Sequence, residues 1–309
     1  MNLILLSKYF LLNQIKYFVI CFFLFNGLNS DSSLGQQPTD DVNNFQVGFS
    51  ANVFRGVYEN DATAAAKVLT EFLLKHYNRD YYEVEPPAIF NDTDELRNII
   101  KKQDFEVLIM HPSEFIQVKD LELLEPIAVS WRSGSPFDSY YLLVHKDSKL
   151  QGLKDLKAQS ILICSLEGNK AELWLDHLLK QKKLGSKERF FSSIEFLDKP
   201  LSIILPVFFK KASACIVDES LYNTVSELNP QIRSELISLE ISRPLAIGMV
   251  TIRKNISDLK LKDQITEAFL TLHNYEEARQ YLTVFRIGKV IEYKEEYLNS
   301  TYEIMGLTK

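Results

Sequence analysis

The chain has 309 residues, of which 46% are hydrophobic and 25% are charged. This composition is that of a globular protein, and it excludes a chain that is disordered over most of its length. The formal net charge is −6 at pH 7, so the chain is a poor partner for nucleic acid. The length allows two domains.

Residues 1–30 differ from the rest of the chain. Lys8 and Lys16 precede the apolar run Tyr17 to Phe25, and no acidic residue occurs before Asp31. This order is typical of a secretory signal, which predicts export and cleavage near Ser30. An uncleaved membrane anchor is the alternative. Cleavage would remove two of the 35 basic residues and none of the 41 acidic ones, which gives a net charge of −8.

The first third of the remaining chain alternates strands and helices. Asp61 and Asp92 are candidate N-caps, each followed by apolar residues at helical spacing. Residues 105–110 form an apolar run of the kind that a buried parallel strand requires. The expected elements are a strand over 45–50, a helix from Asp61, a strand over 81–89, a helix from Asp92 and a strand over 105–110.

A second series with the same alternation follows, and a pair of extended crossovers is expected to join the two lobes. The C-terminal part is predicted to be helical and to return to the first lobe. The expected elements are a helix over 113–118, strands over 123–131, 140–145 and 161–165, a helix over 168–183, a strand over 194–197, a helix over 201–211, a strand over 214–218, a helix over 219–228, a strand over 235–241, an apolar segment over 246–252, and helices over 261–273, 276–284 and 294–304.

The pattern therefore predicts an α/β protein with two lobes, each a mainly parallel sheet flanked by helices, hinged at two crossover strands. Lobe 1 is expected to comprise residues 45–143 and 243–309, and lobe 2 residues 144–242. A signal or anchor over 1–30 and a linker over 31–44 precede them.

Chemical motifs are scarce. The sequence has no Gly-rich phosphate loop, His-Glu-x-x-His, Gly-x-Ser-x-Gly or Cys-x-x-Cys motif. Cys164 and Cys215 are expected near opposite ends of parallel neighbouring strands, so we predict two buried thiols and no disulfide. No enzyme activity, cofactor or metal is expected.

Candidate ligand residues follow the strands at their carboxyl ends, where open α/β sheets bind small molecules. Ser50, Asn52 and Arg55 follow the first strand, and Arg55 could grip a carboxylate or phosphate with two hydrogen bonds. His111 and Ser113 follow a second strand. A solvated arginine and a helix cap are the alternative interpretations of Arg55 and Ser113.

The turn before the second-lobe helix contains Ser165, Gly168, Asn169 and Lys170. A helix N-terminus offers unpaired N–H groups and the positive end of the dipole to an oxyanion. Lys170 could add a charge or could be a solvated lysine of the first turn, and Glu167 weakens the case for an anion.

These segments, in their order and spacing, resemble the periplasmic solute-binding proteins of phosphate, phosphite and phosphonate ABC importers, which have the type 2 periplasmic-binding fold. The resemblance covers about residues 45–305 and is carried by residues 105–115, 139–148 with 153–157, 214–218 and 268–273. The ending His-Pro-Ser-Glu-Phe of residues 111–115 is similar to the family pattern Gly-Pro-x-x-Tyr.

The resemblance also identifies departures. The family holds its anion with Ser-Thr-Ser-Gly where this chain has residues 168–171, and a pocket histidine is replaced by Pro200. Asp218 resembles the family residue that contacts an amino group of the ligand, although it could equally cap the next helix. Tyr140 could line the pocket or pack at the hinge.

The resemblance implies a monomeric periplasmic receptor that closes on a small anionic or zwitterionic ligand of the phosphonate or phosphate class and docks on an ABC permease. The alternative is a sensory module of the same fold, with an altered or lost pocket, coupled to a membrane sensor protein.

Overall fold

The computed structural model describes residues 44–54, 56–77 and 83–307. Residues 1–41 and 42–309 form separate units, and all described elements belong to the second. The expected signal or anchor and Arg55 therefore lie outside the described residues. Among the described helices, none combines the length and the hydrophobicity needed to cross a bilayer.

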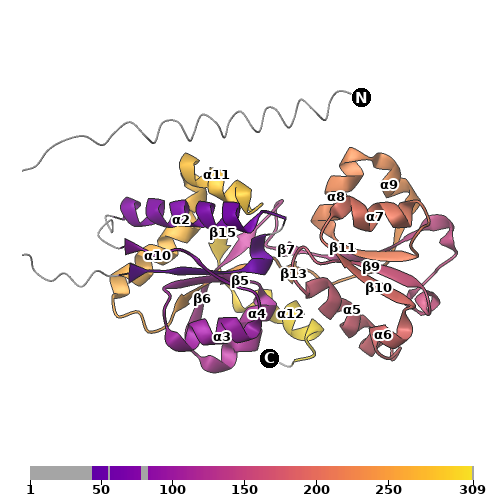
Figure 1. Ribbon diagram of the computed structural model, residues 1–309, viewed down its shortest axis with the longest axis horizontal. Coiled ribbons are helices and arrows are strands. Elements are labelled where there is room, and N and C mark those ends of the chain that lie inside the picture. Colours follow the sequence, from indigo (N-terminus) through magenta and orange to yellow (C-terminus); the bar gives the residue numbers. More distant parts are fainter. Residues whose placement is uncertain (1–43, 55, 78–82, 308–309) are drawn as a thin grey trace, which may run out of the picture. The chain divides into compact units, whose positions relative to one another are not determined.

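The first lobe is built on a six-stranded sheet with the order β15-β6-β14-β5-β2-β4 (Figure 1). Strands β4, β2 and β5 are parallel, as the alternation predicts, whereas β14 is antiparallel to both β5 and β6, and β15 is antiparallel to β6. Its strands are β2 (Val47–Ser50), β4 (Ala88–Phe90), β5 (Val107–Met110), β6 (Leu124–Trp131), β14 (Met249–Arg253) and β15 (Lys289–Glu292), and a separate pair joins β1 (Asn44–Phe45) to β3 (Glu83–Val84).

Helices cover both faces of this sheet. Along β5, Val107 contacts the core under α2 and α10, whereas Leu108 and Met110 contact the core under α3 and α4, as side chains of successive strand residues must. The helices are α2 (Glu59–His76), α3 (Thr93–Lys102), α4 (Pro112–Val118), α10 (Leu259–Thr271), α11 (Glu276–Val284) and α12 (Asn299–Ile304), with 3₁₀ turns at η1 (Ala51–Phe54), η2 (Lys119–Leu121), η5 (Leu272–Asn274) and η6 (Glu295–Leu298).

Three local predictions for this lobe were wrong. Helix α2 begins at Glu59, with Tyr58 at the N-cap and no side-chain cap, so Asp61 lies in the first turn, where an acidic residue is favoured by the helix dipole, and is not the N-cap. The strand expected over 81–89 is divided around Pro86 and Pro87, which cannot donate to a sheet. Strand β15 was missed. The prediction that Asp92 caps its helix is confirmed, since its carboxylate accepts from two backbone N–H groups.

The second lobe contains a five-stranded sheet with the order β10-β9-β11-β8-β12 (Figure 1). Strands β10, β9 and β11 are parallel, and β8 is antiparallel to its neighbours β11 and β12. The elements are β8 (Tyr140–His145), η3 (Lys146–Ser148), η4 (Leu153–Leu156), β9 (Ser160–Cys164), α5 (Lys170–Gln181), α6 (Lys187–Phe190), β10 (Ser193–Leu197), α7 (Pro200–Phe208), β11 (Ala214–Asp218), α8 (Glu219–Leu228), α9 (Pro230–Glu235) and β12 (Leu236–Ile241).

The strands β7 (Phe137–Asp138) and β13 (Leu245–Ala246) pair antiparallel between the two sheets. They are the two chain crossings that the sequence predicts. Every residue of β8 pairs within the second sheet, so the division expected between residues 143 and 144 falls inside that strand. The last helix, α12, contacts α4 of the first lobe and α5 of the second.

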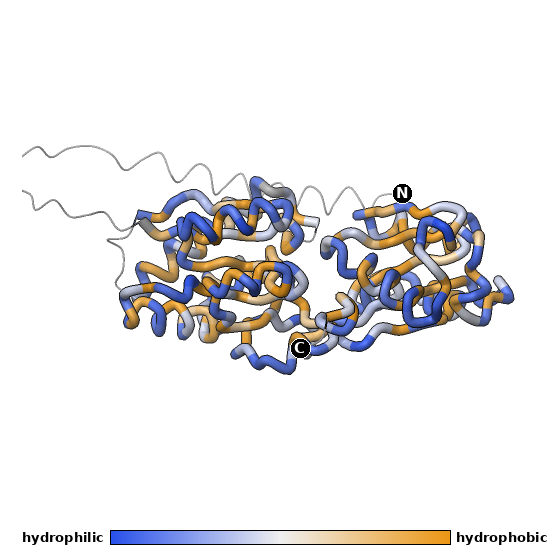
Figure 2. Tube along the Cα trace, turned by 90° about the horizontal axis from the view of Figure 1, so that it is seen from below, coloured by the Kyte–Doolittle hydropathy of each residue, from blue (hydrophilic) through white to orange (hydrophobic). Residues whose placement is uncertain are grey.

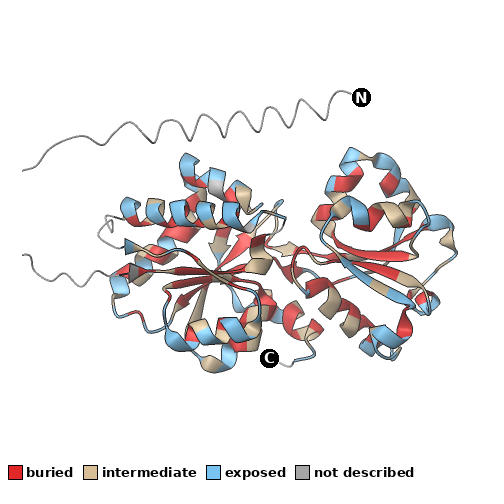
Figure 3. Ribbon diagram, in the orientation of Figure 1, coloured by how far each residue is buried: buried red, intermediate tan, exposed pale blue. Residues whose placement is uncertain are grey.

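Each lobe has its own core. Hydrophobic segments run through both lobes (Figure 2). Buried residues are concentrated in the strands, and exposed residues lie on the outer helix surfaces (Figure 3). Cys164 and Cys215 are buried and are not joined by a disulfide, as predicted. Cys215 pairs in register with Leu162, two residues before Cys164. Burial raises the pKa of the Cys215 thiol, so both thiols behave as small core hydrophobes.

Candidate functional site

The loop after β2 is held by a carboxylate. Ser50 Oγ donates to Glu114 Oε1 at 2.6 Å, and Asn52 Nδ2 donates to the same oxygen at 2.9 Å. The other oxygen, Glu114 Oε2, accepts from the backbone N–H of His111 at 2.7 Å. The side chains of Ser50 and Asn52 therefore lie together, as expected, but they donate to an acidic residue of helix α4.

His111 joins three segments at this point. Its Nδ1 lies 2.8 Å from Ile247 O, and its Nε2 lies 3.0 Å from Asn52 O. Burial lowers the pKa of His111, and the nearby Lys170 ammonium lowers it further. A neutral imidazole has one N–H, so it donates to one of the two carbonyls at a time. Ser113 is buried in the first turn of α4.

The turn before α5 meets the loop after β2 directly. Gly168 has φ of +66°, and a Cβ placed on it would lie 2.8 Å from Asn52 Cγ. Only glycine fits this position without displacement. Ser165 accepts from the Gly168 N–H at 3.2 Å, and Asn169 is an exposed N-cap whose side chain does not cap the helix. The loop after β2 and the turn before α5, which the sequence indicated as candidate ligand loops, are therefore in contact where the two lobes meet.

A buried charge cluster lies at this junction. Lys170 Nζ lies 2.8 Å from Glu167 Oε2, and Arg132 Nη1 lies 2.8 Å from Glu167 Oε1. The side chains of Glu167 and Lys170 are each only 4% exposed. Arg132 also approaches Asp138 Oδ2 at 3.8 Å. Lys170 is therefore not the solvated lysine of the alternative interpretation.

The cluster links the lobes. Arg132 follows β6 of the first lobe, and its Nε donates to Arg286 O at 2.9 Å. Lys170 begins α5 of the second lobe, and its Nζ donates to Ile247 O at 3.0 Å. Arg132 and Glu114 were not predicted as site residues. The signal for Arg132 was its place at the end of a long strand, directly before the turn Ser133-Gly134-Ser135.

Two predicted residues lie elsewhere. Tyr140 is 3% exposed, and its ring stacks on Trp174 in the core of the second lobe. Asp218 is fully buried and accepts from the Leu221 N–H and from Ser220 Oγ, so it caps α8 as the alternative interpretation held. Both side chains are oriented by packing and capping within their own lobe.

An open groove lies beside the cluster, between the lobes. It has a volume of about 630 Å³. The first lobe contributes Arg132, Ser133 and Arg286. The second lobe contributes the beginning of α7 and one side of α8, on which Leu221 and Val225 are buried and Leu228 is exposed. The volume is in the range of small-molecule sites, about 300–1,000 Å³.

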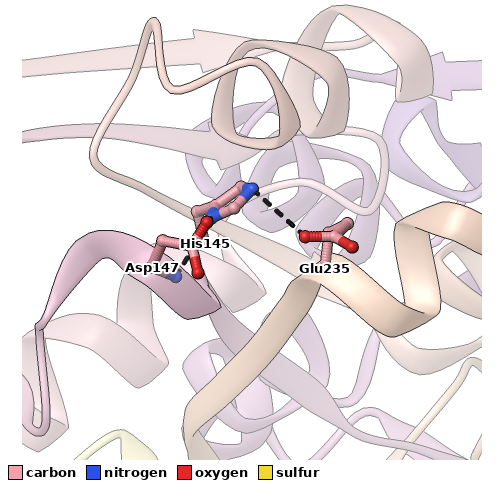
Figure 4. A group of neighbouring side chains, drawn as sticks. All are labelled: His145, Asp147 and Glu235. Atoms are coloured by element: carbon pink, nitrogen blue, oxygen red, sulfur yellow. Dashed lines mark hydrogen bonds and ion pairs between the residues drawn. The ribbon is translucent and has the colours of Figure 1, made fainter.

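Figure 4 shows a group of potential metal ligands, His145, Asp147 and Glu235, at the end of β8. Their ligand atoms already have partners. Lys210 binds Asp147 at 2.9 Å and Lys146 binds Glu235 at 3.0 Å, while His145 Nδ1 accepts from the Asp147 N–H at 3.1 Å. A cation would have to compete with two ammonium groups, so we assign this group to the stability of the second lobe.

Comparison with known proteins decides the family. Residues 59–298 match the family described as "ABC transporter, phosphonate, periplasmic substrate-binding protein". The chain belongs to this family. The prediction from sequence resemblance is thereby confirmed, and the family is one of substrate-binding proteins for ABC transport. No curated protein matches the chain in sequence.

Solved structures share the fold at low sequence identity. XAC2383 from Xanthomonas citri, in a structure with bound chloride, is 10% identical with a TM-score of 0.65, and the match covers 85% of this chain and 96% of that one. The binding protein component of an ABC phosphonate transporter from Pseudomonas aeruginosa is 14% identical, with a TM-score of 0.61 and coverage of 85% and 86%. PhnD1 from Prochlorococcus marinus, in complex with methylphosphonate, is 15% identical, with a TM-score of 0.60 and coverage of 84% and 96%. The predicted fold, two α/β lobes of the periplasmic-binding type, is confirmed.

Proposed function

We propose that this phosphonate-binding family member is exported to the periplasm, binds a small anionic or zwitterionic solute of the phosphonate or phosphate class between its lobes, and delivers it as a monomer to an ABC permease. The observation that supports this most is the convergence of Arg132 and Lys170, from different lobes, on the single carboxylate of Glu167.

This arrangement supports anion binding because two basic groups already hold one carboxylate out of water. Charged hydrogen bonds of this length are the strong ones, and arginine matches the geometry of carboxylate and phosphate oxygens. When the Glu167 side chain rotates away, an oxyanion of the ligand can bind Arg132 and Lys170 in its place. A zwitterion can bind all three, with its ammonium group on Glu167.

The position of the cations also explains how binding would close the lobes. A ligand held by Arg132 and Lys170 bridges β6 of the first lobe and α5 of the second, so each bond made across the lobes favours the closed state. The predicted residues Ser50, Asn52, His111, Ser165, Gly168 and Asn169 then support the loops around the ligand. Arg55 stays a candidate for direct contact.

The test is a thermal-shift screen with phosphate, phosphite, phosphonates, sulfonates and amino acids. A ligand at about 100 times its Kd should stabilise the folded protein by about 2.7 kcal/mol. Arg132→Ala should abolish the shift. Arg97→Ala is the control, since Arg97 forms an exposed ion pair with Asp120 at 2.7 Å and should leave the shift unchanged. If none of these compounds stabilises the wild type, the proposed receptor function is wrong.

A second candidate is a sensory module of the same fold that reports to a membrane protein. It is favoured by the internal partners of the polar loop groups, because Ser50 and Asn52 donate to Glu114 and Lys170 pairs with Glu167. Mass spectrometry of the chain isolated from its own cells discriminates the two. Retention of residues 1–30 favours an anchored sensor, and cleavage near Ser30 favours the soluble receptor.

A further inference from the structure

The groove between the lobes has a one-sided charge. Three basic residues line it, Arg132, Lys199 and Arg286. Arg132 is already paired with Glu167, which lies behind it and does not line the groove. No acidic side chain is among the described residues that line it, although the whole chain carries a net charge of −6. A concave surface lined by charge of one sign attracts ligands of the opposite sign, so the groove favours an anionic occupant.

The same groove has an apolar wall. Leu221, Val225 and Leu228 line it from α8, and their spacing of four and three residues places them on one face of the helix. Leu201, from the first turn of α7, also lines it. Leu201 is 52% exposed and Leu228 is 80% exposed, so both leucines remain available to cover an apolar group.

The polar side chains on α8 do not compete for a ligand. Ser220 Oγ donates to Asp218 Oδ1 at 2.7 Å, and Thr224 Oγ1 donates to Ser220 O at 2.8 Å. Recognition in the groove is thus divided between basic groups and aliphatic surface. An occupant that satisfies both needs an anionic head and an apolar tail.

We propose that the groove is the subsite for an apolar tail, and that the ligand class is an amphipathic anion, such as an alkyl or aryl phosphonate or sulfonate. The head binds beside Arg132, Lys199 and Arg286, and the tail lies on Leu201 and Leu228. This inference rests on the proposed function, because Arg132 belongs both to the groove and to the charge cluster.

The experiment is a titration by calorimetry with a homologous series from methylphosphonate to octylphosphonate, below the concentration at which the longest member forms micelles. Each methylene that leaves water should tighten binding by up to about fourfold. 1-Octanol is the uncharged probe and should bind much more weakly than octylphosphonate, since it lacks the anionic head.

The variants Leu201→Ser and Leu228→Ser should abolish the dependence on chain length while methylphosphonate binds as in the wild type. Both leucines are exposed, so the substitutions should not prevent folding. Leu259→Ser is the matched control, because Leu259 is 70% exposed at the start of α10 and does not line the groove. Lys199→Gln should weaken every member of the series alike.

The possible results of the titrations test the tail subsite, the role of the basic residues and the receptor function separately. Affinity that rises with chain length in the wild type and in Leu259→Ser, but not in the groove variants, supports the subsite. If methylphosphonate binds and the longer alkylphosphonates bind no more tightly, the proposal of a tail subsite is wrong, whereas the proposed receptor function is supported. A rise that survives in both groove variants places the tail elsewhere, and 1-octanol that binds as well as octylphosphonate overturns the role of the charges. If no anion of any length binds, both proposals are wrong.

Discussion

Glu167 is the residue on which the charge balance of the interlobe junction depends. It is 4% exposed and shares its two oxygens between Arg132 and Lys170. Removal of one partner from a buried ion pair leaves an uncompensated charge, which is far more costly than the pair itself is stabilising. The substitution Glu167→Gln should therefore reveal whether the two cations accept another anion.

We expect Glu167→Gln to lower the free energy of unfolding by about 3 kcal/mol in a buffer free of phosphate. Methylphosphonate should then restore more stability to this variant than it adds to the wild type, because it supplies the missing negative charge. Urea unfolding with and without the compound measures both effects.

The control for this experiment is Glu240→Gln. Glu240 pairs with Lys182 at 3.0 Å, and both side chains are more exposed, so its loss should cost at most about 1 kcal/mol. Equal rescue of the two variants would show that the compound acts without regard to the Arg132 and Lys170 pair.

His111 gives the junction a dependence on pH. Its pKa in the folded protein is lowered by burial and by Lys170 from an ordinary value of 6.5. Below about pH 6.5 the unfolded chain binds a proton that the folded protein does not, so stability is complete above that pH and falls as the pH is lowered. The slope for one proton is at most about 1.4 kcal/mol per pH unit.

We expect His111→Gln to reduce this slope between pH 7.5 and 5.5, measured by urea unfolding at each pH. The wild-type protein, unfolded at the same pH values, is the reference for this slope. A His111 ring that gains its proton near pH 6.5 or above in an NMR titration would contradict the expected direction.

The sequence indicated some residues of the interlobe junction and missed others for a physical reason. Lys170, His111 and Gly168 stand at strand ends or helix starts, which are local positions. Glu114 and Arg132 act through partners far away in sequence, at Ser50 and Glu167, and local pattern does not encode such contacts. The predicted ligand role of Asp218 competed with capping, and in the structure its carboxylate caps α8.

At the scale of elements, the contact between the turn at Gly168 and the loop at Asn52 fixes how closely the lobes approach. Gly168→Ala should cost about 1–3 kcal/mol, because it combines a strained backbone at φ of +66° with a Cβ 2.8 Å from Asn52 Cγ. Gly185→Ala is the matched control, since Gly185 has φ of +86° and nothing within 4 Å of its Cβ position.

The difference between these two variants measures the interlobe contact alone. Asn52→Ala should remove most of that difference in a double-mutant cycle, because it removes the atoms that the new Cβ meets. Equal costs for Gly168→Ala and Gly185→Ala would show that the contact between the turns carries no energy.

Elements with a strong local pattern were predicted with their observed bounds. Strands β8 and β11 are continuous apolar runs, and α8 follows a clear N-cap at Asp218. Strand β15 was missed because it has only four residues, in which a charged residue stands at each end of the apolar pair Val290-Ile291, and it lies at the edge of the sheet beside β6. Edge strands carry less hydrophobic signal because one side faces solvent.

At the scale of the whole molecule, the repeat of strands and helices was sufficient to predict two α/β lobes joined by two crossings. The sequence could not predict that β14 and β15 run against the other strands of the first sheet, since strand direction depends on distant pairing. Nor did it predict that Arg132 and Glu167 join the lobes.

The helix α12 packs on both lobes. Tyr302 belongs to the core of the first lobe and accepts from Lys119 Nζ at 2.9 Å, while Ile304 belongs to the core of the second. Any hinge motion of one lobe relative to the other must therefore bend α12 or shift its contacts with one of the lobes. An affinity tag fused after Lys309 would begin only a few residues beyond α12 and would load the contacts that this helix makes with both lobes, so binding studies should use the protein without a C-terminal tag.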